Sequence, residues 1–350
     1  MHMDIPPGNS NEGGLLNDDR FLRRVAQRYY EAGETQETIA EKEACSRQMI
    51  GKALQKARDR GIVRISVVPE ERMGYLQNLT RDVRSQLRLE DLVLVPGSNL
   101  KAMENGRVAD GVLADITANA ADYLDHLLTN ETILAVSGGK HIMRNMVRNL
   151  KPTRMLPNLQ VTSTLGFIRP STNFGDPNLI AYDIAIAYGA RHYWLPTPAI
   201  VKTQEQCEQL HNLPLVGDVL QIVEKATVIM LGLWPAADNS DLVKKNILSQ
   251  EQVDALQPYH PVVDIDHWVF DADGRCINDL MDPPPYYLTG PNIPDLKERI
   301  RKEHIKVILV AGASDAYIPG IQAVLKAGIA NILITDHITA ELLLKSSSSE

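Results

Sequence analysis

The chain is poor in aromatic residues and cysteine, and it lacks long apolar runs. Phe, Trp and Tyr together make up 5% of its 350 residues, so its cores must be built mainly from aliphatic side chains. No apolar run approaches the ~18 residues that a membrane-spanning helix needs, which argues against membrane insertion. The cysteines are Cys45, Cys207 and Cys276. Because they are odd in number and far apart, they indicate a reducing, cytoplasmic compartment rather than a disulfide framework.

Both ends of the chain have low-complexity sequence. Residues 1–19 are polar and Gly-rich, without the apolar core of a signal peptide, and are expected to be a disordered lead. Residues 346–350 form a Ser-rich tail. The length of the chain between these two ends suits roughly two domains. No Cys/His group has zinc-ligand spacing, and no dinucleotide or P-loop fingerprint is present. Neither a metal nor a cofactor is therefore expected.

The formal charge of −8 conceals a basic block. Residues 20–64 carry 11 Lys/Arg against 6 Asp/Glu, a net charge of +5, which leaves −13 for the rest of the chain. Within residues 46–64 Asp59 is the single acid among six basic side chains. A basic block on an acidic protein is typical of nucleic-acid binding, although a solvated helix face would give the same charge pattern.

The pattern of the basic block indicates a winged-type helix-turn-helix. Residues 21–31 carry an apolar helical stripe that Gly33 ends, and Thr35 can cap a short second helix. Ser46 can cap a third helix with apolar positions spaced i, i+3, i+4, i+7. Residues 62–68 then read as a strand that could form the wing. Two short helices joined by a tight turn, the second basic on its outer face, are typical of a helix-turn-helix; an unrelated helical hairpin is the alternative.

The outer face of these two helices supplies the candidate DNA contacts. Arg and Gln suit the edges of guanine and adenine, whereas Lys suits phosphates. Because one helix-turn-helix reads a short half-site, a homodimer or homotetramer is expected on operator DNA. The candidate DNA-binding residues are Thr35, Gln36, Ser46, Arg47, Gln48, Lys52, Gln55 and Lys56.

In the second part of the chain, short and almost unbroken apolar runs alternate with helical segments. Strands buried on both faces that alternate with helices imply an open, mostly parallel α/β sheet. In such sheets ligands bind at the carboxyl ends of the strands. The expected strands are 92–95, 133–136, 228–231, 307–310 and 332–334, and the expected helices include 108–128 and 318–326.

Three loops that follow expected strands are the candidate ligand-binding loops, namely residues 137–141, 232–239 and 311–315. Glycines between a strand and a helix expose backbone N–H groups to an anion; a plain strand-to-helix turn is the alternative. Asp266 or Asp315 could accept hydrogen bonds from hydroxyl groups. The candidate effector-binding residues are Ser137, Gly138, Gly139, Lys140, His141, Asp266, Ala311, Gly312, Ala313, Ser314 and Asp315.

Short motifs along residues 20–344 match one family in order. They include Tyr29-Tyr30, Gly33, Thr35-Gln36, Ile39-Ala40, Ser46-Arg47, KARDRGIVRI, LQNLTRDVRSQLRLEDLVLVPG, ILAVSGGKHIMRNMVRNL, YWLPTPAIV, ATVIMLGL, VFDADGRCI and the segment beginning VILVAGASDAYIPG. In these motifs the chain resembles the SorC family of bacterial sugar-responsive transcriptional regulators. The resemblance implies a helix-turn-helix domain followed by a sensor domain whose fold is like that of sugar-phosphate isomerases and deaminases.

The ligand loops depart from the family pattern. The family's first loop runs Gly-aromatic-Gly and ends in a hydroxyl residue, where this chain has Ser137-Gly138-Gly139 and His141. Ala316 stands nearest to the place of a family lysine that helps to hold the ligand's phosphate. A sugar or polyol, a sugar acid and a sugar phosphate therefore all remain open as the small-molecule carbohydrate effector.

The expected function is control of a carbohydrate-metabolism operon, with DNA binding regulated by the effector. The corresponding domains are residues 20–72 for DNA binding, 73–90 for a linker helix and 91–345 for the effector. The alternative function is an enzyme like the sugar-phosphate isomerases or deaminases. Such an enzyme has no need of a basic recognition helix, and no Ser-His-Asp order or strong acid/base pair stands out.

Three smaller patterns leave alternatives open. A stripe in the linker is spaced like a coiled coil and could pack on a partner chain or on the chain's own sensor domain. Asp264 and Asp266 are expected on one strand face, either in the pocket or as ordinary strand-end polarity. Residues 271–274 read as a hairpin turn rather than the start of a calcium loop. The linker stripe consists of Leu76, Leu79, Val83 and Leu87.

Overall fold

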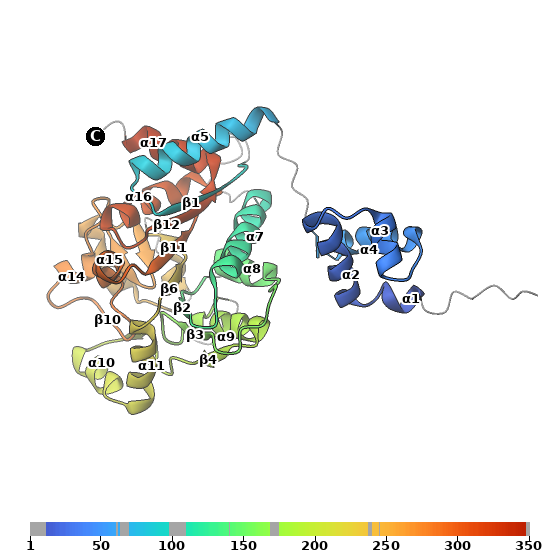
Figure 1. The fold of residues 1–350 in the computed structure, drawn as a ribbon. Coiled ribbons are helices and arrows are strands. Elements are labelled where there is room, and N and C mark those ends of the chain that lie inside the picture. Colours follow the sequence, from blue (N-terminus) through green and yellow to red (C-terminus); the bar gives the residue numbers. More distant parts are fainter. Residues whose placement is uncertain are drawn as a thin grey trace, which may run out of the picture. The chain divides into compact units, whose positions relative to one another are not determined.

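The computed structural model describes residues 12–60, 62–63, 70–97, 110–139, 141–168, 175–236, 240–244 and 246–347. The chain divides into two compact units, Met1–Met73 and Gly74–Glu350. Figure 1 draws the described helices of the smaller unit in blue, and the larger unit runs from cyan to red. Within the described ranges no helix is both long and apolar enough to cross a membrane.

Three helices of the smaller unit pack around one apolar core. Asp18, Thr35 and Ser46 cap them, each accepting a backbone N–H with its side chain, which confirms the two caps expected from the sequence. The core consists of Phe21, Leu22, Val25, Ala26, Ile39, Ala40, Met49, Ile50, Ala53, Leu54 and Ala57. The described helical segments are α1 (Glu12–Leu15), α2 (Asp19–Ala26), the π-helical η1 (Gln27–Glu31), α3 (Gln36–Lys42) and α4 (Arg47–Asp59).

The ends of these helices follow the sequence pattern, but the wing is not described. Gly33 has a φ of 67°, so the backbone leaves the first helical segment through the left-handed region that favours glycine. Residues 62 and 63 do not form a strand. The remainder of the expected wing, residues 64–68, lies outside the described part of the chain.

The larger unit is built on a seven-stranded sheet in which every strand pair is parallel. All five expected apolar runs are strands of this sheet, which confirms the parallel α/β prediction. Two further strands, β3 and β4, were not expected. In spatial order the strands are β1 (Asp91–Val95), β12 (Ile332–Asp336), β11 (Lys306–Val310), β6 (Val228–Leu231), β2 (Ile133–Val136), β3 (Gln160–Ser163) and β4 (Arg191–Tyr193).

Helices cover both faces of this sheet (Figure 1). One layer comprises α7 (Asp110–Leu127), α8 (Ile142–Asn149) and α9 (Pro177–Tyr188), which contact one another in turn. The other layer comprises α11 (Pro214–Glu224), α15 (Leu296–Glu303), α16 (Ile318–Ala327) and α17 (His337–Ser347). The central strands β12, β11, β6 and β2 are buried on both faces, which explains their almost unbroken apolar sequence.

Smaller elements surround the main sheet. A three-stranded sheet joins β7 (Trp234–Pro235), β8 (Val263–Ile265) and β9 (Trp268–Phe270), and β5 (Ile200–Val201) pairs with β10 (Tyr287–Leu288). The remaining described helices are α10 (Gln204–His211), α12 (Ser240–Lys244), α13 (Gln250–Leu256), α14 (Ile277–Leu280) and the 3-10 segments η3 (Gln257–Tyr259), η4 (Ile293–Asp295) and η5 (Asp315–Tyr317).

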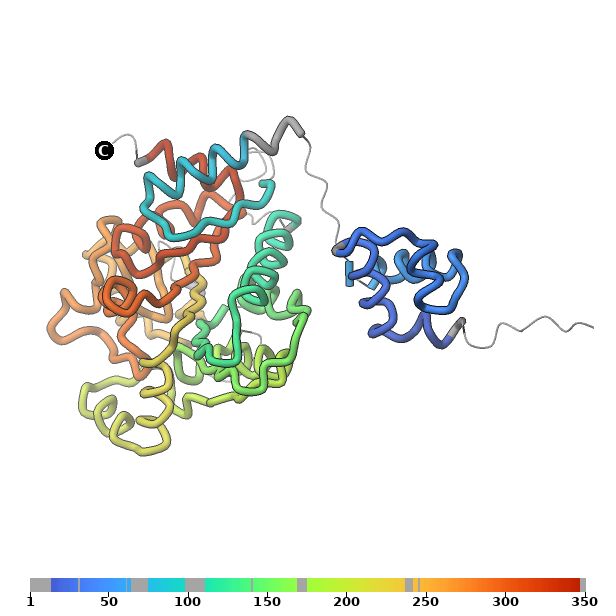
Figure 2. Tube along the Cα trace, in the orientation of Figure 1, coloured from blue at the N-terminus to red at the C-terminus, as the bar shows by residue number. Residues whose placement is uncertain are grey.

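Helix α5 (Glu70–Gln86) contains the linker stripe and packs on the larger unit. Leu79 and Val83 are buried in the same apolar core as the main sheet. The Tyr75 hydroxyl donates to Glu341 of α17, and α5 runs beside α17 in Figures 1 and 2. Leu79 and Val83 therefore pack on the chain's own unit, whereas pairing of the remaining, partly exposed part of the stripe with a partner chain stays a prediction.

Replacing Leu79 with Ala should lower the free energy of unfolding of the larger unit by about 2–5 kcal/mol, since it removes a buried side chain and leaves a cavity. Chemical denaturation of the intact chain measures the change. Leu215→Ala is the matched control, because Leu215 is 69% exposed and its truncation should change stability by less than about 0.5 kcal/mol. Equal stability of the two variants would contradict the packing of α5 described above.

Candidate functional site

The pocket of the larger unit lies where the strand order of the sheet reverses. Strands β2 and β6 are neighbours, yet the chain passes from β2 outward to β3 and β4 before it returns to β6. The loops that follow β2 and β6 therefore diverge at their ends and leave a crevice at the carboxyl edge. Both loops line a cavity of about 480 Å³, which lies in the range of small-molecule sites.

The cavity is mainly apolar, with a few polar side chains. Its walls come from the two loops, from the β8–β9 hairpin and from helix α12. The lining residues are Gly138, Gly139, His141, Ile142, Met143, Leu165, Ile168, Gly175, Gly232, Leu233, Trp234, Leu242, Lys244, Ile247, Asp264, Asp266, His267 and Tyr317.

The cavity brings together only part of the predicted effector set. Gly138, Gly139, His141 and Asp266 line it. Ser137 lies behind the wall, buried, with its Oγ accepting the N–H of Gly232 at 2.8 Å. Lys140 lies outside the described residues. The other predicted residues, which are not among those that line the cavity, are Ala311, Gly312, Ala313, Ser314 and Asp315.

The loop after β11 makes its polar contacts within the protein. The N–H of Ala313 donates to the carboxylate of Asp336 at 2.8 Å, and the Ser314 hydroxyl accepts the N–H of Ala316 at 3.3 Å. Tyr317, directly after this loop, is the residue that reaches the cavity. The loop therefore supports the wall of the cavity through Tyr317.

The glycine amides after β2 are also engaged. The Gly139 N–H donates to the carbonyl of Gly175 at 3.1 Å, and the Gly138 N–H helps to lower the pKa of the Asp266 carboxyl. Gly139 has a φ of 149°, and a Cβ there would lie 3.2 Å from Met143 Cγ, so only glycine fits without strain. One of the two amides that the sequence pattern assigned to a ligand anion is thus bonded within the protein, and the other lies near a protein carboxylate.

Asp266 and His267 form a turn that the sequence pattern did not indicate. Ile265 pairs with Trp268 across β8 and β9, so Asp266 and His267 form a two-residue hairpin loop. Their φ angles are 52° and 67°, and positive φ at both positions is the requirement of a type I′ turn. The expectation that Asp264 and Asp266 share one strand face is therefore wrong, because the chain reverses at Asp266. No Asn-Gly or Asp-Gly pair marks this turn in the sequence.

Burial and neighbouring charges set the protonation of the turn. Burial raises the pKa of Asp266 to about 6, against the opposing effects of the Thr164 hydroxyl, which donates to it, and of His267. His267 is 6% exposed, and its Nδ1 lies 3.3 Å from Asp264 Oδ2. Burial lowers the pKa of His267, but the charge and hydrogen bond of Asp264 and the charge of Asp266 outweigh it, so the pKa is raised.

One nitrogen of the His267 ring faces a carboxylate, and the other has no hydrogen-bond partner among the described residues. Asp264 Oδ1 accepts the His267 backbone N–H at 2.7 Å, and the imidazole Nδ1 faces the second oxygen of that carboxylate. The buried Nε2 has no hydrogen-bond partner among the described residues. An orphaned buried nitrogen in a cavity wall is a position at which a ligand can supply the missing partner.

In the smaller unit, the outer face of α4 carries the exposed candidates for DNA contact. Arg47, Gln48 and Lys52 are exposed on this face. Arg47 forms an ion pair at 2.9 Å with Glu37 of α3, and both side chains are exposed, so the pair contributes little stability. No hydrogen bond of Gln48 or Lys52 is found within the described part of the chain. These three side chains can therefore turn toward DNA at little cost.

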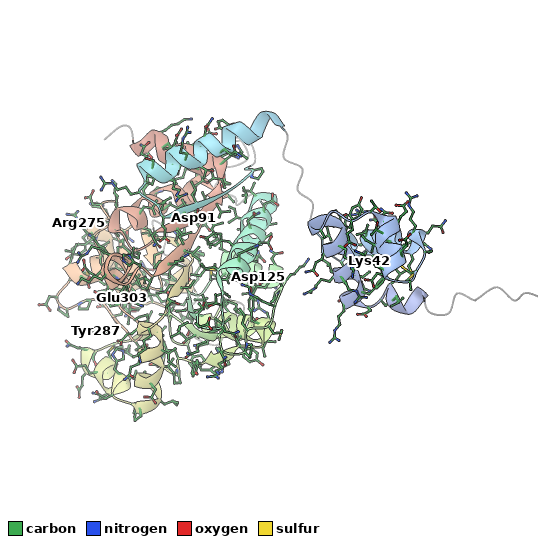
Figure 3. The ribbon with its side chains drawn as sticks, in the orientation of Figure 1. Lys42, Asp91, Asp125, Arg275, Tyr287 and Glu303 are labelled. Carbon is green, nitrogen blue, oxygen red and sulfur yellow. The ribbon has the colours of Figure 1, made fainter. Side chains whose placement is uncertain are left out.

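The other predicted DNA contacts serve the unit's own structure. Thr35 and Ser46 cap α3 and α4, and Gln36 lies at the first turn of α3. Gln55 donates to Asp59 at 2.8 Å, and Lys56 donates to Asn17 at 2.8 Å. Figure 3 labels Lys42 on the same unit, where it pairs with Glu34 at 2.7 Å.

Hydrogen bonds from Arg275 and Asp273 close the Asp271 turn. Arg275, labelled in Figure 3, donates to Asp271 with its Nε at 2.8 Å and with its backbone N–H at 2.9 Å. The backbone N–H of Asp273 donates to the same carboxylate. Among the described residues no group of three His, Cys, Asp or Glu side chains could hold a metal ion. The interpretation of residues 271–274 as a turn is confirmed.

The raised pKa of Asp266 makes stability pH-dependent. Folding takes up a proton between the unfolded pKa of 3.8 and the folded value of about 6, so the free energy of unfolding falls as pH rises through this window. Asp266→Asn stays neutral, and Asn tolerates positive φ. The variant should gain about 2 kcal/mol relative to the parent between pH 4.5 and 7.5. Denaturant titrations at both pH values measure this gain, and an equal difference at both would contradict the shift.

Comparisons with known proteins agree with the fold. The model of a sugar-binding domain family, Sugar-bind, matches residues 72–345. The chain is 25% identical over 346 residues to the transcriptional regulator YjhU of Escherichia coli K12, covering 98% of each chain. It is 24% identical to the deoxyribonucleoside regulator of Bacillus subtilis, over 91% of this chain and 96% of the relative.

A solved structure shares the fold. The full-length sorbitol operon regulator SorC from Klebsiella pneumoniae matches with a TM-score of 0.64 and 21% sequence identity, over 93% of this chain and 98% of that one. These relatives are named as transcriptional regulators and not as enzymes, which confirms the regulator reading of the sequence. The chain belongs to the SorC-type family of transcriptional regulators that carry a sugar-binding domain.

Proposed function

We propose that this chain controls a carbohydrate-metabolism operon: the smaller unit binds operator DNA, and a carbohydrate in the cavity of the larger unit changes that binding. The observation that carries the proposal is the cavity at the β2–β6 crevice, on the same chain as a three-helix unit with an exposed basic helix face. The cavity combines apolar walls with a few polar groups, as small-molecule sites do.

The DNA contact is proposed on the first turns of α4. Arg47 and Gln48 occupy its N-terminal turn, where recognition helices contact base edges. Lys52 lies one turn further and suits a phosphate. The caps Thr35 and Ser46, with Gln36, Gln55 and Lys56, would border this surface. Since each unit reads one half-site, the regulator is proposed to bind as a homodimer or homotetramer.

The effector is proposed to bind against Gly138, Gly139, His141 and Asp266, with Trp234 and Tyr317 in the apolar wall. Ala311–Asp315 would act behind this wall, through Tyr317. A sugar demands matched donors and acceptors, because an unmatched buried polar group costs about 1–3 kcal/mol.

The proposal is tested with the intact chain and a duplex selected from random DNA by the chain itself. A panel of sugars, polyols, sugar acids and sugar phosphates is screened by thermal shift, where a ligand at 100 times its Kd should stabilise by about 2.7 kcal/mol. The ligand that stabilises should also change affinity for the selected duplex. A stabilising ligand without any effect on DNA affinity would refute effector control, and failure to select any duplex would refute DNA binding.

Replacing Gln48 with Ala should reduce discrimination between the selected duplex and a single-base variant by about 1–3 kcal/mol, if the amide reads a base edge. Lys52→Ala should instead weaken binding to all duplexes alike and reduce the slope of log affinity against log salt by about one. Arg23→Ala, an exposed position on α2, is the matched charge control and should change neither property. Binding titrations at several salt concentrations measure all three variants.

A further inference from the structure

The Asp266–His267 turn carries an inference about which part of the ligand it contacts, and this inference rests on the proposed function of the cavity. Both residues adopt positive φ, at 52° and 67°, which is uncommon for residues other than glycine, although Asp and His adopt it more often than most. A type I′ turn favours Asn-Gly, so Asp-His keeps strain that Asn-Gly would remove. Both side chains line the cavity. Strain that persists at a cavity wall points to a role for these two side chains there.

The acceptors of the turn are only partly used by the protein. The Asp266 carboxylate accepts from the Thr164 hydroxyl, and a carboxylate has about four acceptor positions. His267 is oriented by Asp264 through Nδ1 and through its backbone N–H, and its buried Nε2 has no partner within the described residues. The Asp266 carboxylate and His267 Nε2, which are neighbours in the cavity wall, can therefore each form a hydrogen bond with a ligand.

A hydroxyl group is the partner that fits both positions. It can donate to the Asp266 carboxylate, and it can donate to a neutral Nε2 or accept from a protonated one. A phosphate or carboxylate fits poorly, because the carboxyl groups of Asp264 and Asp266 flank the histidine. Apolar Trp234 lies directly opposite Asp264 in the β7–β8 pair and lines the same cavity.

We propose that the Asp266–His267 turn binds two adjacent hydroxyl groups of the carbohydrate, one at the Asp266 carboxylate and one at His267 Nε2. The effector is therefore a sugar or polyol with a vicinal diol, and its end at the turn is uncharged. Any acidic group of the effector lies away from the turn. Asp264 is a positioning residue, because it fixes the ring that contacts the ligand.

The first test uses ligands that differ by one hydroxyl. D-ribose and D-glucose, each with its 2-deoxy and 3-deoxy analogues and with the terminal phosphate esters of all of these, are titrated calorimetrically into the intact chain. Loss of a hydroxyl that contacts the turn should weaken binding about 5- to 150-fold, since it leaves a buried group unmatched. If a parent sugar binds and no deoxy analogue is weaker by fivefold, the proposal is overturned.

The second test changes the turn itself. Asp266→Asn/His267→Gly supplies the favoured turn sequence, so this variant should fold and melt no lower than the parent while binding the parent sugar at least fivefold more weakly. His267→Asn, which tolerates positive φ, is a milder variant with the same expected direction. His304→Gly is the matched control, because His304 has a φ of 55° at the exposed end of α15 and does not line the cavity. It should bind as the parent does.

The outcomes separate this inference from the function on which it rests. Parent-like sugar binding by the double variant and by His267→Asn overturns the diol contact but leaves carbohydrate control intact. Equal weakening in His304→Gly would also overturn it, because the loss would then reflect relief of backbone strain in general. Absence of any stabilising ligand in the whole panel of sugars, polyols, sugar acids and sugar phosphates would contradict the proposed function itself.

Discussion

The cavity of the larger unit depends on the pairing of β2 with β6. The two strands are parallel neighbours with Ala135 opposite Ile229, so the loops that follow them start at the same edge. Ser137 then joins the two loops: its backbone N–H donates to the Met230 carbonyl at 2.9 Å, and its Oγ accepts the Gly232 N–H at 2.8 Å. This contact holds the glycine loop beside the segment that carries Trp234. Without the reversal of strand order between β2 and β6, the two loops would not enclose a space.

Internal hydrogen bonds decide which groups of the cavity remain for a ligand. The Gly139 amide is taken by Gly175 and the Ala313 amide by Asp336, and the Gly138 amide lies near the carboxylate of Asp266. A glycine loop after a strand offers amides to an anion only when no group of the protein reaches them first. Here the half-buried Asp266 carboxylate lies beside the loop, and its desolvation raises its pKa. The polar groups that a ligand can contact are therefore side chains of the Asp266–His267 turn more than backbone amides of the loops.

The sequence predicted the features that follow from local patterns. Apolar runs identified five buried strands, and Thr35, Ser46 and Gly33 marked helix ends through their caps. Strand β4 was missed because Arg191-His-Tyr is polar and lies at the sheet edge, where one side of the strand has no neighbour. The Asp266–His267 turn was missed because it lacks the glycine that usually marks positive φ. The cavity was predicted only in part, because sequence order says which loops reach the carboxyl edge but not how far each side chain extends across it.

The linker stripe illustrates a different limit. Apolar spacing showed that one face of α5 is covered, but the same spacing suits a partner helix and the chain's own core. Leu79 and Val83 belong to the core that also contains Ala135, Val136 and Met230 of the strands that border the cavity. A ligand shifts DNA binding only if it binds two states of the chain with different affinity. The side chains of α5 and of the strands that border the cavity therefore share one close-packed core, so the same apolar face that links α5 to the sheet also links it to the walls of the cavity.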